Sequence, residues 1–140
     1  MTVEHWNNPT EPAPELSPSE VISIQLEALK NNDMPTPDSG IRTTFSFASP
    51  ANRQFTGPID RFIALVKNPL YASMLNYQAA ELGPLNINED QAYQLIKLVD
   101  RAGQIVIYSF ALSRQHDNEY EGCWMTDGVT VVRQPGQSQA

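Results

Sequence analysis

The stretch that decides the fold is SGIRTTFSFASPANRQFTGPIDRFIALVK, residues 39–67, where apolar spacing and turn residues concentrate. Its second part predicts a helix that begins at Gly57-Pro58, with the glycine as N-cap and the proline as first helical residue. Apolar residues then recur at helical spacing, at Ile59, Phe62, Ile63 and Val66. The first part leaves two alternatives open over Ile41–Phe47, because its apolar residues fit a helix after an Asp38 cap and also the alternation of a strand. Ser49-Pro50 breaks either one.

An earlier helix is predicted from Ser17 to Leu29. Ser17 is placed to cap it, Pro18 to take its first position and Glu20 to complete a capping box. A broad apolar arc follows, made of Val21, Ile22, Ile24, Leu26, Ala28 and Leu29. We therefore expect most of this helix to be buried, and one or two further helical turns to follow Pro69.

From Asn76 onward the apolar period falls towards two, which predicts strands at residues 76–82, 91–99, 104–115 and 123–132. Gly83-Pro84 is expected to end the first strand, and residues 100–103 to form a hairpin connection. At Asp127-Gly128 a bulge is favoured over a tight turn, since a hairpin would leave arms of only about four residues. One face of the third strand is expected to meet the helices, namely Val106, Tyr108, Phe110 and Leu112. Helices followed by antiparallel strands predict an α+β domain.

The length of 140 residues predicts one folded domain, over residues 16–132. Residues 1–15 are rich in proline and poor in apolar side chains, so we expect a disordered tail, with Trp6 as its exception. Residues 133–140 are expected to form a C-terminal tail. The beginning of the chain lacks the basic flank and apolar run of a secretory signal, and no run is long enough to span a membrane.

The net charge of −7 argues against nucleic acid or a membrane surface as partner, since both attract positive faces. The single cysteine, Cys123, cannot form an internal disulfide, which fits a reducing compartment. We therefore expect a cytoplasmic protein. The only cationic region is the central stretch, where Arg42, Arg53, Arg61 and Lys67 face one acid, Asp60.

The segment GIRTTFSFASPANRQFTGPIDRF, preceded by LEALKNND and followed by NPLYASMLNY, resembles the signature of a small domain family of unknown function. That family is grouped with the nuclear transport factor 2-like, or cystatin-like, folds. The resemblance covers about residues 17–132. It implies that the helices pack on a curved antiparallel sheet of about four strands, which wraps around them as a cone. Members of the wider fold group include isomerases, dehydratases, ligand binders and dimerisation modules, so the fold does not decide the function.

The sequence holds few candidates for catalysis. Its two histidines are His5, in the expected tail, and His116, in a charged loop, so no metal site or cofactor is expected. A carboxylate inside an apolar cone can act as a base when burial raises its pKa. The candidates for that role are Asp127 and then Asp60, each with a plain structural alternative: a bulge residue and an acid in the first turn of a helix.

Two further groups are candidates for binding. The aromatic residues Phe45, Phe62, Tyr71, Tyr108, Phe110 and Trp124 can line a pocket for a flat apolar ligand, or can simply form the core. The arginines Arg42, Arg53 and Arg61 can bind an anion or an acidic partner, or can pair with the acids of this chain.

We expect a non-enzymatic interaction or dimerisation module, with a second copy or another protein as partner. Its interface is expected on the open sheet face, at Ile105, Ile107 and Ala111. The alternative is a small-molecule binder, or a cofactor-free lyase or isomerase that uses a carboxylate in the cone.

Overall fold

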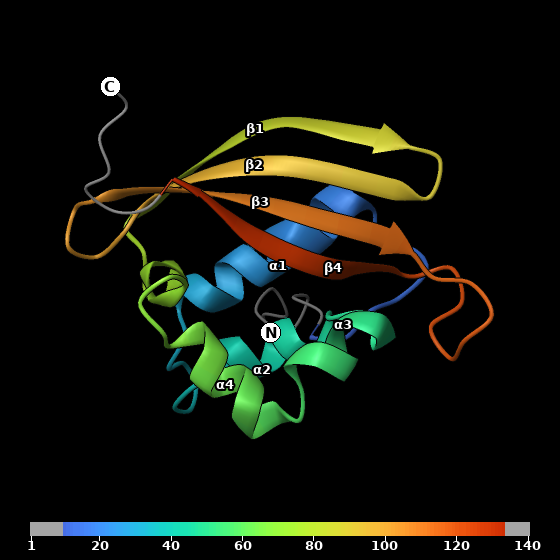
Figure 1. Cartoon of the computed structure of the whole chain (residues 1–140), viewed down its shortest axis with the longest axis horizontal. Coiled ribbons are helices and arrows are strands. Elements are labelled where there is room, and N and C mark those ends of the chain that lie inside the picture. Colours follow the sequence, from blue (N-terminus) through green and yellow to red (C-terminus); the bar gives the residue numbers. More distant parts are fainter. Residues whose placement is uncertain (1–9, 134–140) are drawn as a thin grey trace, which may run out of the picture.

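The computed structural model describes residues 10–133 and has an α+β fold, with all helices on one side of a single sheet (Figure 1). The predicted tails, with Trp6 and His5, lie outside the described residues except for residues 10–15 and 133. The helices are α1 (Pro18–Lys30), α2 (Ser39–Ser46), α3 (Pro50–Thr56), α4 (Ile59–Val66) and the short 3₁₀ helix η2 (Ala72–Met74). The strands are β1 (Ala79–Asn88), β2 (Gln91–Val99), β3 (Ile105–Arg114) and β4 (Trp124–Arg133).

The sheet is an antiparallel meander with the order β1-β2-β3-β4, and it arches over the helices without closing into a barrel (Figure 1). In β2 and β3 every second residue is buried against the helices, and Val106, Tyr108, Phe110 and Leu112 are the members of this set from β3. This confirms the predicted inward face. Among residues 10–133, no helix packs on the opposite face.

The predicted start of α1 is confirmed in detail. The hydroxyl of Ser17 accepts from the Glu20 N–H at 3.1 Å, and the Glu20 carboxylate accepts from the Ser17 N–H at 2.9 Å. These two bonds satisfy backbone donors that a helix leaves unpaired in its first turn. The face that follows them, from Val21 to Leu29, packs beneath the sheet.

The decisive stretch forms three helices, α2, α3 and α4, which are separated at residues 47–49 and 57–58. The alternative over Ile41–Phe47 is resolved in favour of a helix, which ends at Ser46 with Phe47 as its C-cap. The predicted break at Ser49-Pro50 is confirmed as the end of the first helical piece, but the same two residues also begin α3, which was not predicted. Ser49 caps it by accepting from the Asn52 N–H at 3.2 Å, and Pro50 takes its first position. Serine followed by proline interrupts a preceding helix, but serine is also favoured as an N-cap and proline as the first helical residue. The helix predicted from Gly57-Pro58 begins at Ile59, with Pro58 as N-cap.

The first strand differs from its prediction. It runs from Ala79 to Asn88, so Gly83-Pro84 lies inside it instead of ending it. The register shifts between Leu82 and Leu85, and the side chain of Gln94 donates to the Gly83 carbonyl at 2.7 Å. Proline is tolerated there because β1 is an edge strand, where a missing N–H leaves no ladder bond unmade.

The bulge favoured at Asp127-Gly128 is confirmed. Thr126 pairs with Leu112 and Gly128 pairs with Ala111, which leaves Asp127 as the extra residue of β4. The hairpin connection between β2 and β3 is also confirmed, and Gly103 takes the positive φ of 86° there. Among residues 10–133, no helix is long and apolar enough to cross a membrane.

Candidate functional site

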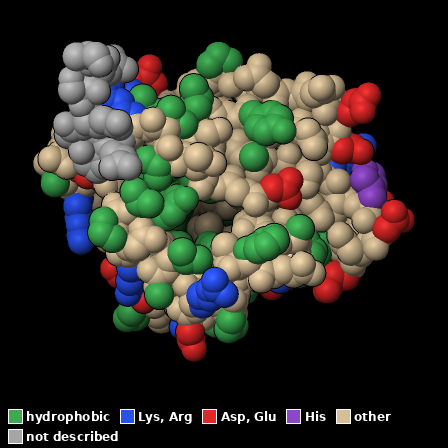
Figure 2. Space-filling model, viewed as in Figure 1, with side chains coloured by type: hydrophobic (Ala, Val, Ile, Leu, Met, Phe, Trp, Pro, Cys, Tyr) green, Lys and Arg blue, Asp and Glu red, His purple; other side chains and the backbone are tan. Residues whose placement is uncertain are grey.

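The candidate site is a cavity of about 190 Å³ between the helices and the sheet. Figure 2 shows a hollow on this side of the molecule, between the surface formed by β4 and that formed by α3 and α4. Every helix of the fold contributes to the lining, and β3 and β4 close the other side. The lining residues are Gln25, Leu29, Thr44, Ala48, Asn52, Thr56, Phe62, Leu65, Val66, Tyr71, Met74, Phe110, Thr126, Gly128 and Val129.

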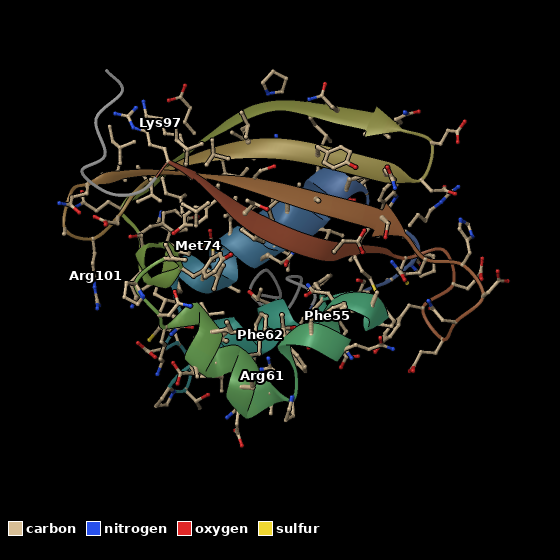
Figure 3. The ribbon with its side chains drawn as sticks, viewed as in Figure 1. Phe55, Arg61, Phe62, Met74, Lys97 and Arg101 are labelled. Carbon is tan, nitrogen blue, oxygen red and sulfur yellow. The ribbon has the colours of Figure 1, made fainter. Side chains whose placement is uncertain are left out.

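The apolar wall comes from both layers of the fold. Phe62 belongs to α4 and Met74 to η2, and both lie beneath the sheet (Figure 3). Phe110 enters from β3 and is fully buried. The phenol of Tyr71 donates to the Val129 carbonyl of β4 at 3.0 Å, which ties the segment after α4 to the sheet at the cavity wall.

The polar side of the cavity is organised around Thr126. Its backbone N–H donates to the Phe47 carbonyl at 2.7 Å, and its carbonyl accepts from the Ser49 N–H at 2.8 Å. The side-chain amide of Asn52 also donates to that carbonyl, at 3.1 Å. The Thr126 hydroxyl lies against the side-chain amide of Gln25, 2.8 Å from Nε2 and 3.1 Å from Oε1. Four residues therefore converge on one residue of β4: Gln25 of α1, and Phe47, Ser49 and Asn52 of the stretch between α2 and α3 and the start of α3.

The other two lining hydroxyls are satisfied within their own helices. Thr44 donates to the Gly40 carbonyl at 3.0 Å, and Thr56 donates to the Asn52 carbonyl at 3.0 Å. Each bond reaches back four residues, which is a local pattern that competes with the helix ladder instead of holding distant elements together. These hydroxyl oxygens therefore keep acceptor capacity at the cavity wall.

Half of the aromatic set predicted to line a pocket does so: Phe62, Tyr71 and Phe110. The other three lie in the core around it. Phe45 packs on Phe62 with ring centroids 5.0 Å apart, and Tyr108 stacks on Tyr71 at 6.1 Å. The Tyr108 hydroxyl donates to the Leu70 carbonyl at 2.8 Å, and burial raises the pKa of this phenol far above its ordinary value of 10. Trp124 is buried in the core cluster.

The two candidate carboxylates do not line the cavity. Asp127 is exposed at the bulge, whereas the Thr126 side chain beside it is buried and lines the cavity. Asp60 is exposed in the first turn of α4. Among residues 10–133 no group of three or more histidines, cysteines and carboxylates could hold a metal ion. Cys123 is buried, and burial raises the pKa of its thiol.

The three candidate arginines have separate surroundings. Arg42 and Arg61 are exposed on α2 and α4, the latter at the lower edge of the view in Figure 3. The guanidinium of Arg53 lies between the rings of Phe45 and Tyr120, at 5.0 and 5.5 Å from their centroids, and donates to the Ser46 carbonyl at 2.8 Å. None of the three lines the cavity.

Sequence reasoning did not identify the polar residues of the cavity. The signal that could have found two of them is a polar side chain on an otherwise apolar helical face: Gln25 within Val21–Leu29, and Thr44 beside Ile41. A buried polar side chain is more informative than a buried apolar one, because it needs a partner. Asn52, Thr56 and Thr126 carry no such signal, since the fold alone brings them to the same place.

Comparison with family models gives one match, to a family described as "Domain of unknown function (DUF4864)", over residues 14–139. Comparisons with curated proteins and with solved structures gave no significant match.

Proposed function

The chain belongs to the family described as a domain of unknown function (DUF4864), which assigns it no activity. From the geometry of the site, we propose that the protein binds a small molecule in the cavity under the sheet. The cavity of about 190 Å³ carries this proposal. Protein interiors are close-packed, and a dry apolar cavity of about 150 Å³ is already enough for benzene. The volume lies below the range of about 300–1,000 Å³ that is typical of sites for drug-sized ligands, so this space suits only a compact compound of about one ring.

Binding without chemistry is the role that the lining supports. No aspartate, glutamate, histidine, lysine, arginine or cysteine is among the described residues that line the cavity. A general base must lie within hydrogen-bond reach of the atom it deprotonates. A catalytic role for Asp127 or Asp60 would therefore need a movement that brings a carboxylate into the cavity.

The test compares two variants on the same face of the same strand. Val129 lines the cavity, whereas Val131 packs on the core outside it. Val129→Phe adds a ring to the cavity and should abolish the binding of neutral monocyclic fragments, detected by ligand-observed NMR. Val131→Phe should bind them as the wild type does. If the wild type binds no fragment, or if both variants bind equally, the proposal is wrong.

A second candidate is an interaction module that uses the outer sheet face. The observation that favours it is a group of apolar side chains on β2 and β3 that no element of residues 10–133 covers: Tyr93 is 46% exposed, Leu95 50% and Ile105 38%. Ile107 and Ala111, which are half-buried, belong to the same face. Exposed apolar groups of this kind often mark interfaces. Analytical ultracentrifugation at high concentration should show a dimer that Leu95→Glu dissociates, and a monomer at all concentrations would contradict a homodimer.

We also infer that the fold is of the nuclear transport factor 2-like type. Helices that precede a four-stranded antiparallel meander, a sheet that arches over them and a cavity between the two layers support this inference. An experimental structure with another strand order would contradict it.

A further inference from the structure

The polar groups of the cavity restrict what it can accept, and this restriction rests on the proposed function. The hydroxyls of Thr44, Thr56 and Thr126 and the phenol of Tyr71 each donate to an acceptor within the protein. Both N–H groups of the Gln25 amide have partners as well, the Val21 carbonyl at 3.2 Å and Thr126 Oγ1 at 2.8 Å. The hydroxyl oxygens retain lone pairs, because an oxygen that donates one hydrogen bond can still accept another.

The cavity therefore offers acceptors in excess of donors. The Asn52 amide donates one N–H to the Thr126 carbonyl, which leaves its second N–H as a donor for a ligand. A ligand that brings its own donor can pair with any of several wall oxygens, whereas a ligand that brings only acceptors has this one N–H and otherwise competes for donors that already have partners. An unpaired polar group in an apolar enclosure loses its hydration without replacement, which costs free energy.

The charges of the lining restrict the ligand further. No lysine, arginine or histidine of the lining can pair with an anion, and no carboxylate can pair with a cation. An isolated charge is far more costly to bury than a neutral polar group. Although Arg42, Arg53 and Arg61 make the central stretch cationic, they do not line this cavity.

We infer that the cavity binds a neutral molecule about the size of one substituted ring that donates a hydrogen bond to a threonine oxygen of the wall. A phenol or a cyclic alcohol has this chemistry. The rings of Phe62 and Phe110 supply the apolar contact. Thr44 and Thr56 supply the acceptors, because their hydroxyls bond only within their own helices and can bind a ligand without disturbing contacts between elements.

Three probes of similar size test this inference by NMR titration. They are 4-methylphenol, which donates, 4-fluorotoluene, which has the same number of heavy atoms and no donor, and benzoate, which is charged. One net hydrogen bond corresponds to roughly a three- to ten-fold difference in affinity, so 4-methylphenol should bind that much tighter than 4-fluorotoluene. Benzoate should show no saturable binding.

A double variant then locates the acceptor. Thr44→Val/Thr56→Val keeps the branched shape and removes both hydroxyls, so the preference for 4-methylphenol over 4-fluorotoluene should fall to about one. The control, Thr43→Val/Thr130→Val, changes two threonines outside the cavity lining and should keep the preference.

The outcomes separate the two proposals. If 4-fluorotoluene binds as tightly as 4-methylphenol, the inferred ligand class is wrong while the cavity remains a binding site. If the double variant keeps the preference, the assignment of the acceptor to Thr44 and Thr56 is wrong. Saturable binding of benzoate that Val129→Phe abolishes would likewise overturn the requirement for a neutral ligand. If none of the probes binds, the proposed function falls together with the inference.

Discussion

Two parts of one core differ in how they fill space. Ile22, Ile41 and Phe47 are fully buried between the helices and the sheet, and none of the three lines the cavity. Beside them, where Gln25, Thr126 and their neighbours line the interior, about 190 Å³ stays open. Apolar side chains can shift to fill a gap, since their contacts have no fixed direction. Thr126 cannot, because hydrogen bonds from several segments hold it in place.

The largest expected effect contrasts two phenylalanines. Phe47 is fully buried away from the cavity, and Phe110 is equally buried but lines it. Truncation of a buried phenylalanine to alanine costs about 3–5 kcal/mol. We expect the loss of unfolding free energy to lie near the upper end of this range for Phe47→Ala and near the lower end for Phe110→Ala. The reason is that part of the Phe110 ring faces the cavity and has fewer contacts to lose. Urea unfolding measures both, and a larger loss for Phe110→Ala would contradict the comparison.

An intermediate effect contrasts two alanines, where an added pair of methyl groups has opposite consequences. Ala92 is fully buried on the inward face of β2 and lies outside the cavity lining, so Ala92→Val should overpack the core at a cost of about 1–3 kcal/mol. Ala48 lines the cavity, so Ala48→Val should change the free energy of unfolding by between zero and a gain of about 1 kcal/mol. Equal destabilisation by both would mean that the cavity is not open in solution.

A smaller effect concerns pH: the stability of the loop between β3 and β4 should depend on pH, whereas ligand binding in the cavity should not. The ring of His116, in that loop, contacts the carboxylate of Glu121 in the same loop at 3.0 Å and that of Asp90, in the turn between β1 and β2, at 2.9 Å. Hydrogen bonds that the protonated ring donates to Glu121 and Asp90 raise the pKa of His116 above its ordinary 6.5. Bonds from the Asp117 N–H and His116 lower the pKa of Glu121 below 4.5, and the bond from His116, aided by Arg114, lowers the pKa of Asp90 below 3.8.

The sign follows from these directions. The contribution of His116 to stability is complete below about pH 6.5 and is lost as the pH rises through its raised pKa. The contributions of Glu121 and Asp90 are complete above about pH 4.5 and are lost as the pH falls through their lowered pKa values. The loop should therefore be best protected between these limits, as measured by hydrogen exchange at the Asp117 amide. Binding of 4-methylphenol should not change from about pH 5 to 8, because no lining residue titrates there.

The smallest effect is expected for a change at Asp127, which should alter neither ligand binding nor stability. Asp127 lies beside Thr126 and Gly128, both of which line the cavity, but its own side chain is exposed. Asp127→Asn should leave fragment affinity and the free energy of unfolding unchanged, within about 0.5 kcal/mol. A loss of fragment binding in this variant would return the carboxylate to the site and reopen the lyase or isomerase alternative.

Local patterns were enough for much of this fold. Three features depend only on residues that are close together in the sequence: the capping box at Ser17, the alternation in β2 and β3, and the bulge at Asp127-Gly128. Their local sequence pattern was therefore enough to predict them. Where local signals pointed two ways, the prediction failed or stayed open. Ser49-Pro50 both ends one helix and begins another, and Gly83-Pro84 ends a strand unless an edge position accommodates it.

The sequence by itself therefore determined the class of the fold, the order of its elements and the inward face of its central strands. It also supplied three of the aromatic side chains that line the cavity. Only the tertiary structure decided that the cavity exists, that its acceptors come from Thr44, Thr56 and Thr126, and that Asp127 and Asp60 stay outside it. The physical reason is that a cavity is a difference between the volume that packed elements enclose and the volume that their side chains fill. That difference depends on contacts between residues as far apart as Gln25 and Thr126, which no local pattern contains.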